Sequence, residues 1–412
     1  MTTKVSLRRA AIPAALSLVL LGCGESKHED SDEIRIGLLL PYTGKDGSAG
    51  GNYERGVLMA VDRINAAGGL HDKPVRILYG DTHSSVERGL ASAQELADRG
   101  VVAIIGPESD ELARALPPVL SEAGVALLTP SSSSVPVGSS QDLDMWFRLA
   151  PSSKDLASAL ARKMKVDGAQ RVAIISTDAE YEASFASGIE ERLGAIAVSV
   201  AASTKISAST TDFSAAIAAV VAASPDAIVL AADATTASKF VNDFSFKSGK
   251  HDLQWYLSPS LEQPGFLLNA STDALEGMVG VAPAVSPDGA RTDGFTEAFV
   301  KRWKGSKPTT GAFYYYDAVA LFAVAYEAAP VLEGELLPDA QSVRDHVLSS
   351  SGQSGVVFEW DELQKGIANA RDGKAVYYSG VTGVIALDRS GGRSAAYTRF
   401  WTIERGQFVA LK

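Results

Sequence analysis

The chain has 412 residues, of which 46% are hydrophobic and 21% are charged, and its formal net charge is −11. The charge argues against nucleic-acid binding, which calls for a basic surface, and the length is sufficient for two domains. The five histidines are scattered without metal-ligand spacing, and Cys23, as the single cysteine, has no partner for a disulfide. We therefore predict no metal site and no cofactor.

The N-terminus has the pattern of a targeting segment. Three basic residues precede an apolar run at 10–21 that is too short to span a bilayer, and Leu20-Leu21-Gly22-Cys23 ends it. This tetrapeptide resembles the lipobox of bacterial lipoproteins, in which the cysteine is lipidated and becomes the mature N-terminus. We expect a signal peptide at 1–22, lipidation of Cys23 and a tether at 23–33. The alternative is an ordinary signal peptide with a chance cysteine.

From residue 34 onward, apolar strand patterns alternate with amphipathic helix patterns, which indicates parallel sheets with helices on both faces. In the first part, the pattern predicts strands at 34–40, 75–79, 101–105 and 125–128, a flexible glycine-rich loop at 47–51, and helices at 53–66, 85–98 and 110–123. After 146–151 it restarts, with strands at 171–176, 195–201 and 227–230 and helices at 181–193 and 212–223. A return crossing at 279–284, an apolar helix at 310–328 and short C-terminal strands with hairpin turns at 383–411 follow.

Serines follow two neighbouring predicted strands. Ser109 comes after strand 101–105, and Ser131–Ser134 follow strand 125–128. Ligands of open α/β sheets bind at the carboxyl ends of the strands, so we predict a small-molecule rim here. A mobile low-complexity loop is the alternative for the serine run. The three tyrosines Tyr314–Tyr316 are expected to pack into the core rather than to contact a ligand.

Many short motifs, in order and at fitting spacings, make the chain similar to the leucine/isoleucine/valine-binding family of periplasmic substrate-binding proteins. They are Gly37–Pro41, Thr43-Gly44, Gly56, Asp62, Ile64–Gly69, Asp81, Ile105–Pro107, Thr129-Pro130, Arg148, Tyr181, Tyr316–Ala318 and Gly383–Asp388. The resemblance implies an α/β fold of two Rossmann-like lobes with parallel sheets, joined by three hinge crossings. It implies an N-terminal lobe at 34–150 and 283–370, and a C-terminal lobe at 151–282 and 371–412. It also implies a ligand held between the lobes and hinge closure that presents the closed form to an ABC permease.

The same resemblance implies a set of ligand contacts. In the first lobe they are Ser109, Asp110, Ser131 and Ser133. Asp110 occupies the position of the family's carboxylate-binding serine, Ser131 would contact the ligand by its backbone carbonyl, and Ser133 would contact it by its hydroxyl. In the second lobe they are Ser153 for the usual acidic residue, Tyr181 for the loop tyrosine, Asp233 for an aromatic residue and Ser260 for the ammonium-binding glutamate.

Four of these positions, Asp110, Ser153, Asp233 and Ser260, depart from the family pattern in charge. The carboxylate of Asp110 would repel a carboxylate of the ligand. With serine at position 260, the acidic partner for a ligand ammonium group is lost, although Asp233 could provide another. Alternatively, Asp110 caps its helix and points away from the cleft, and Asp233 is a solvated turn residue. If both aspartates face the cleft, a neutral or cationic ligand fits better than leucine.

We therefore expect a lipid-anchored solute-binding protein on the periplasmic or outer side of a bacterial membrane. Its partners would be a small polar ligand, such as an amino acid or a related amide, and the membrane subunits of an ABC importer. A sensor of the same fold that signals to a membrane partner is the alternative. An enzyme is disfavoured because the sequence has no nucleophile-elbow motif and no cysteine–histidine pair.

Overall fold

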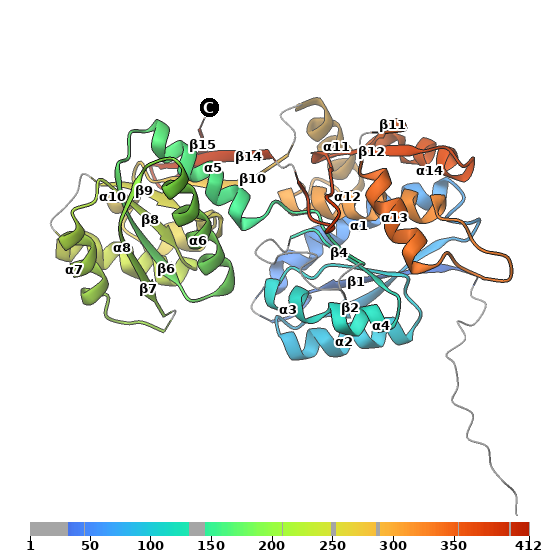
Figure 1. Cartoon of the computed structure of the whole chain (residues 1–412), viewed down its shortest axis with the longest axis horizontal. Helices are drawn as coiled ribbons and strands as arrows, with labels where there is room; N and C mark the ends of the chain where they lie inside the picture. Colours follow the sequence, from blue (N-terminus) through green and yellow to red (C-terminus); the bar gives the residue numbers. More distant parts are fainter. Residues whose placement is uncertain are drawn as a thin grey trace, which may run out of the picture. The chain divides into compact units, whose positions relative to one another are not determined.

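The computed structural model describes residues 32–44, 46–131, 145–207, 209–248, 253–285, 289–352, 354–394 and 397–411 (Figure 1). The predicted signal peptide, Cys23 and Ser133 lie outside these residues. The described part of the chain belongs to one compact unit, Asp32–Lys412. Within these ranges, no helix combines the length and the apolar character needed to cross a membrane.

The first lobe is built on a five-stranded parallel sheet with the order β2-β1-β3-β4-β5. Its strands are β1 (Ile34–Leu40), β2 (Val75–Asp81), β3 (Ala103–Ile105), β4 (Ala126–Thr129) and β5 (Trp146–Arg148). A parallel strand covered on both faces is almost continuously apolar, and β1, with the sequence IRIGLLL, fits this pattern. Its alternate residues enter different cores: Leu38 packs in one buried cluster and Leu39 in another.

Helices cover both faces of this sheet. One face carries α2 (Val86–Asp98), α3 (Asp110–Ala115) and α4 (Pro117–Glu122). The other carries α1 (Gly47–Ala66), α11 (Gly289–Arg302), α12 (Thr310–Ala328), α13 (Ala340–Ser350) and α14 (Leu363–Arg371). Figure 1 shows α2 and α4 on the side of the sheet opposite to α12 and α13. A small three-stranded sheet of β11 (Val356–Glu359), β12 (Val376–Gly380) and β13 (Gly383–Val384), with the 3-10 helix η2 (Trp360–Glu362), completes this lobe.

The second lobe is built on a seven-stranded sheet with the order β15-β14-β10-β9-β8-β6-β7. Its strands are β6 (Arg171–Thr177), β7 (Ser199–Ile206), β8 (Ala227–Ala231), β9 (Gln254–Leu257), β10 (Val279–Ala284), β14 (Tyr397–Glu404) and β15 (Gln407–Ala410). The first five pair in parallel, whereas β14 and β15 are antiparallel additions at one edge. Helices α5 (Ser153–Val166) and α6 (Glu180–Ala195) cover one face. The other face carries α7 (Ser214–Ala223), α8 (Ala234–Ser248), α9 (Pro264–Asn269), α10 (Thr272–Leu275) and the 3-10 helix η1 (Pro259–Leu261).

The two-lobed parallel α/β fold predicted from the sequence is confirmed, and α12 spans the predicted residues 310–328. The glycine-rich stretch 47–51 was wrongly predicted as a loop, since it forms the first turns of α1. A Cβ at Gly50 would lie 2.9 Å from the carbonyl oxygen of Pro41, so glycine here serves close packing rather than flexibility. The predicted helix 110–123 is split into α3 and α4, because Pro117 lacks the N–H that a continuous helix requires.

One predicted lobe boundary has to be moved. Residues 371–412 were expected in the C-terminal lobe, but Val376 and Tyr378 pack in the same buried cluster as β1. The buried Asp317 of α12 holds this segment: its carboxylate accepts hydrogen bonds from the Tyr378 hydroxyl and from the backbone N–H groups of Val381 and Thr382. Among the described residues of the segment 371–412, only those of β14 and β15 pack in the second lobe, so we assign the last crossing to the chain before β14.

A buried arginine, Arg393, connects the segments that lead from one lobe to the other. Its guanidinium donates to the carbonyl oxygen of Leu149, where the first crossing begins, and to that of Val384. It also lies 5.6 Å from the ring centre of Tyr314, and the Tyr314 hydroxyl donates to the carbonyl oxygen of Ala284 at the second crossing. Residues adjoining all three crossings therefore meet at one point.

Candidate functional site

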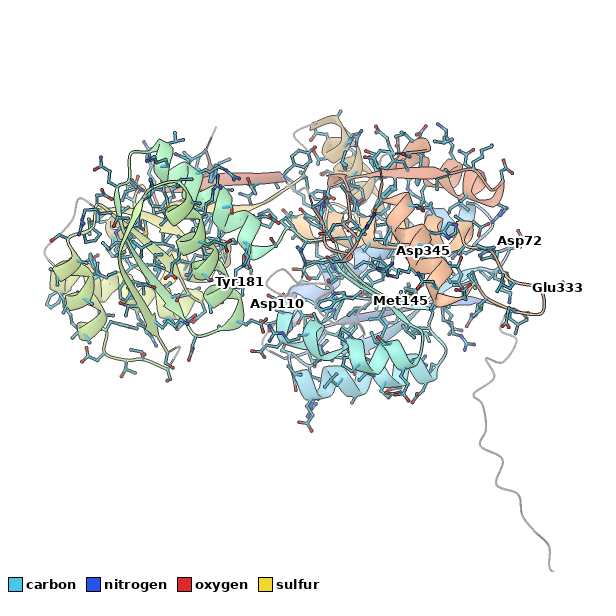
Figure 2. The ribbon with its side chains drawn as sticks, viewed as in Figure 1. Asp72, Asp110, Met145, Tyr181, Glu333 and Asp345 are labelled. Atoms are coloured by element: carbon cyan, nitrogen blue, oxygen red, sulfur yellow. The ribbon has the colours of Figure 1, made fainter. Side chains whose placement is uncertain are left out.

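A cavity of about 700 Å³ is lined by residues of both lobes. From the first lobe come the start of α1, the turn from β3 to α3, the end of β4 and the start of α12. From the second come the start of α6, η1, the end of β10 and Arg399 of β14. Of the predicted contacts, Asp110 and Tyr181, both labelled in Figure 2, border the cavity, as do Ser109, Ser131 and Ser260. The strand ends thus position the site where open α/β sheets bind ligands.

The wall formed by α3 carries the first two predicted residues. Ser109 is the N-cap of α3, and its hydroxyl accepts a hydrogen bond from the backbone N–H of Leu112 at 3.3 Å. Asp110 is therefore not the cap. It is the first residue of the helix and borders the cavity. Its negative charge contributes to the raised pKa of the buried Glu182.

Tyrosines form a second part of the wall. The hydroxyl groups of Ser131 and Tyr315 lie 3.1 Å apart, and the Tyr315 ring stacks on that of Tyr53 at 4.7 Å between ring centres. Tyr315 is fully buried, as predicted, and burial raises the pKa of its hydroxyl well above the ordinary value. Tyr53 and Tyr314 border the cavity. The three consecutive tyrosines Tyr314–Tyr316 therefore contribute both to the core and to the wall of the site.

The wall formed by α6 and η1 holds an acid that the sequence analysis missed. Glu182 follows Tyr181, is only 7% exposed, and borders the cavity. The hydroxyl of Ser260 donates a hydrogen bond of 2.6 Å to its Oε1 atom. Burial raises the pKa of Glu182, and the negative charges of Asp233 and Asp110 raise it further. Its position beside Tyr181 was the available signal, but it became meaningful only once Ser260 was seen to contact it.

Two predicted contacts do not border the cavity. The hydroxyl of Ser153, 1% exposed, lies 2.7 Å from that of Ser184 and so joins α5 to α6. Asp233 is exposed and accepts hydrogen bonds from the backbone N–H groups of Thr235 and Thr236 at the start of α8. Asp233 therefore has the geometry of a turn residue, which was the alternative interpretation of its position in the sequence.

The basic side chains around the cavity are already engaged with protein groups. Arg399 forms an ion pair of 2.6 Å with Glu262, and Arg114 of α3 pairs with Glu180 of α6. The buried Arg148 donates to the carbonyl oxygen of Ala150 at 2.7 Å, and burial lowers its pKa. Across the residues with described positions, no group of three or more histidine, cysteine or acidic side chains could hold a metal ion.

The family model described as periplasmic binding protein matches residues 33–400, so the chain belongs to that family. It is 27% identical over 184 residues to the Leu/Ile/Val-binding protein BraC3 of Rhizobium johnstonii, covering 44% of this chain and 50% of the relative. It is 28% identical over 199 residues to an amino acid binding protein of Pseudomonas aeruginosa, covering 48% and 52%. The chain thus matches about half the length of these curated relatives.

The fold is similar to that of the branched-chain amino acid transporter substrate binding protein LivJ from Streptococcus pneumoniae, solved with isoleucine. The TM-score is 0.70 at 21% identity, and the match covers 92% of this chain and 98% of that one. At this identity the likeness shows the fold. The family that the sequence resemblance implied is thus confirmed by the family match.

Proposed function

We propose that this protein is a lipid-anchored solute-binding protein that captures a small polar molecule, an amino acid or a related amide, and delivers it to an ABC importer. The observation that carries the proposal is the cavity of about 700 Å³, lined from both lobes, in a member of the periplasmic binding protein family. Pockets for small ligands commonly measure about 300–1,000 Å³. A molecule enclosed between two lobes can hold them together, and the importer then recognises the bound form.

The lining suits a ligand with one apolar and several polar groups. Tyr53, Tyr181 and Tyr314 offer aromatic surface, whereas Ser109, Ser131 and Ser260 offer hydroxyl groups. Pockets of this kind use apolar area for affinity and a few polar groups for orientation. The named relatives that bind leucine, isoleucine or valine support an amino acid as the first ligand class to test.

A melting-temperature screen of the chain from residue 24 onward, which includes the whole compact unit Asp32–Lys412, tests the binding role. The panel holds amino acids, small amides, polyamines, sugars and aromatic acids. A ligand at a hundred times its dissociation constant stabilises the folded protein by about 2.7 kcal/mol, which is readily detected. Tyr181→Ala should lose the shift, whereas Phe246→Ala, which removes a 90% exposed ring that does not border the cavity, should keep it. Absence of a shift with every compound contradicts the proposed ligand class.

The membrane anchor is tested separately in the full-length chain. Cys23→Ala removes the only thiol that could be lipidated. We expect the wild type in the membrane fraction of an expressing bacterium and the variant in the soluble extract. A variant that remains with the membranes, or a wild type without attached lipid by mass spectrometry, would refute lipidation.

A further inference from the structure

The charged side chains among the described residues that line the cavity are mostly acidic. Arg399 is the one base among them, and the acids are Asp46, Glu108, Asp110, Glu111, Glu180, Glu182 and Glu262. Like charges in a poorly hydrated site repel each other more strongly than in water. A ligand with a net negative charge would therefore enter against the field of this wall.

The arginines nearest the acids of the lining are engaged with protein groups, and the buried Arg148 donates to the carbonyl oxygen of Ala150. Arg399 is paired with Glu262, and Arg114 is paired with Glu180. Both ion pairs neutralise an acid at the cost of a base that could otherwise receive a ligand carboxylate. The cavity thus differs from a site built for a free carboxylate.

Glu182 is the acid with the most specific environment. It is buried, it borders the cavity, and the Ser260 hydroxyl donates to its Oε1 atom. A buried carboxylate is costly unless charged or strongly polar groups compensate it, and the Ser260 hydroxyl and the backbone N–H of Glu182 supply neutral hydrogen bonds. An ammonium group of a ligand would supply both the charge and the donors that stabilise the ionised form.

The contact between Glu182 and Ser260 also changes the interpretation of the sequence. Position 260, where the resemblance implies an ammonium-binding glutamate, holds a serine, so the acidic partner was expected to be lost. The structure places a carboxylate from a different element, α6, directly on that serine. A carboxylate therefore lies beside position 260, although Glu182 provides it and residue 260 does not.

From these observations we infer that the cavity selects a ligand that carries an ammonium group and no net negative charge, and that Glu182 is the residue that contacts the ammonium. The inference rests on the proposed binding function and specifies the ligand class. Zwitterionic amino acids satisfy it, and amino amides without a carboxylate satisfy it better.

Four probes that share one branched carbon skeleton test the inference by isothermal titration calorimetry at pH 7. Leucinamide carries only an ammonium, leucine carries both charges, 4-methylpentanamide carries none, and 4-methylpentanoate carries only a carboxylate. We expect the affinity to fall in that order. In Glu182→Gln, leucinamide should bind about tenfold more weakly or worse, which corresponds to a lost charge-assisted hydrogen bond, whereas 4-methylpentanamide should be unaffected.

Two further variants complete the test. Glu191→Gln on the same helix removes an exposed carboxylate that pairs with Lys154 at the surface, and it should leave all four affinities unchanged. The double variant Glu182→Ser with Ser260→Glu exchanges the two side chains and should restore leucinamide binding relative to Glu182→Ser alone. Melting curves of each variant confirm that it is folded.

The outcomes separate this inference from the proposed function. Tightest binding of 4-methylpentanoate, or unchanged leucinamide binding in folded Glu182→Gln, overturns the inference and leaves the binding role intact. Failure of all four probes to bind the wild type contradicts the proposed amino-acid or amide ligand, and the inference falls with it.

Discussion

Replacement of Arg393 by methionine should destabilise the protein strongly. The guanidinium donates to four acceptors: the carbonyl oxygens of Leu149, Thr382 and Val384, and the hydroxyl oxygen of Thr382, at distances of 2.8–3.2 Å. Arg393 is only 2% exposed, so water cannot replace these bonds without rearrangement. Methionine keeps an apolar stem that can pack on Tyr314 but provides no donor.

The size of the effect follows from the number and kind of these bonds. A hydrogen bond to a charged group contributes about 1.5–3 kcal/mol, so four bonds set an upper limit of roughly 6–12 kcal/mol. Removing a buried charge also removes its desolvation cost, and bonds that share one guanidinium are not additive. We therefore expect the free energy of unfolding to fall by about 3–5 kcal/mol.

Urea unfolding of the chain from residue 24 onward measures this change. Arg389→Met, which alters an exposed arginine four residues earlier, is the matched control and should stay within about 0.5 kcal/mol of the wild type. A loss below about 1 kcal/mol for Arg393→Met would show that the network does not hold the crossings together.

Three further predictions concern the site. Asp110→Ser removes a like charge, so 4-methylpentanoate should bind roughly tenfold more tightly by calorimetry; an unchanged ligand profile would place Asp110 outside the site. Ser153→Ala removes the contact with Ser184 and should lower the free energy of unfolding by about 1 kcal/mol, while the affinity for ligands stays constant; a change in affinity would speak against a purely structural role. Burial, assisted by Asp233 and Asp110, raises the pKa of Glu182 above 4.5. Its stabilising contribution is complete below 4.5 and is lost as pH rises through the raised pKa, so Glu182→Gln should gain stability over the wild type with rising pH. A stability difference that is constant with pH would disprove this.

Much of the fold was predictable because hydrophobic periodicity reflects local geometry. The strand at 34–40 and the helix at 310–328 were predicted with the bounds that the structure has. Residues 279–284 were predicted as a return crossing, but they form strand β10 of the second lobe. The prediction was wrong from Gly47 onward, because glycines that permit close packing in α1 were interpreted as a loop. Local patterns do not show what a glycine packs against, and that depends on distant parts of the chain.

Part of the cavity lining was anticipated in two ways. The strand pattern indicated Ser109 and Ser131, and the family resemblance implied Asp110, Tyr181 and Ser260; all five border the cavity. Asp233 and Ser153 do not border it: their polar groups are engaged by the start of α8 and by α6. Position along the chain indicates which end of an element a residue occupies, but not which neighbour its side chain meets.

By itself, the sequence determined the alternation of strands and helices, the family and the edge of the sheets that borders the cavity. These follow from periodicity, turn residues and motif order, all of which are local. Only the tertiary structure decided that Glu182 of α6 meets Ser260 of η1, and that Arg393 meets both Leu149 and Tyr314. Such contacts join residues that are 78 or 244 positions apart. They depend on how the folded elements pack, and no local pattern contains that information.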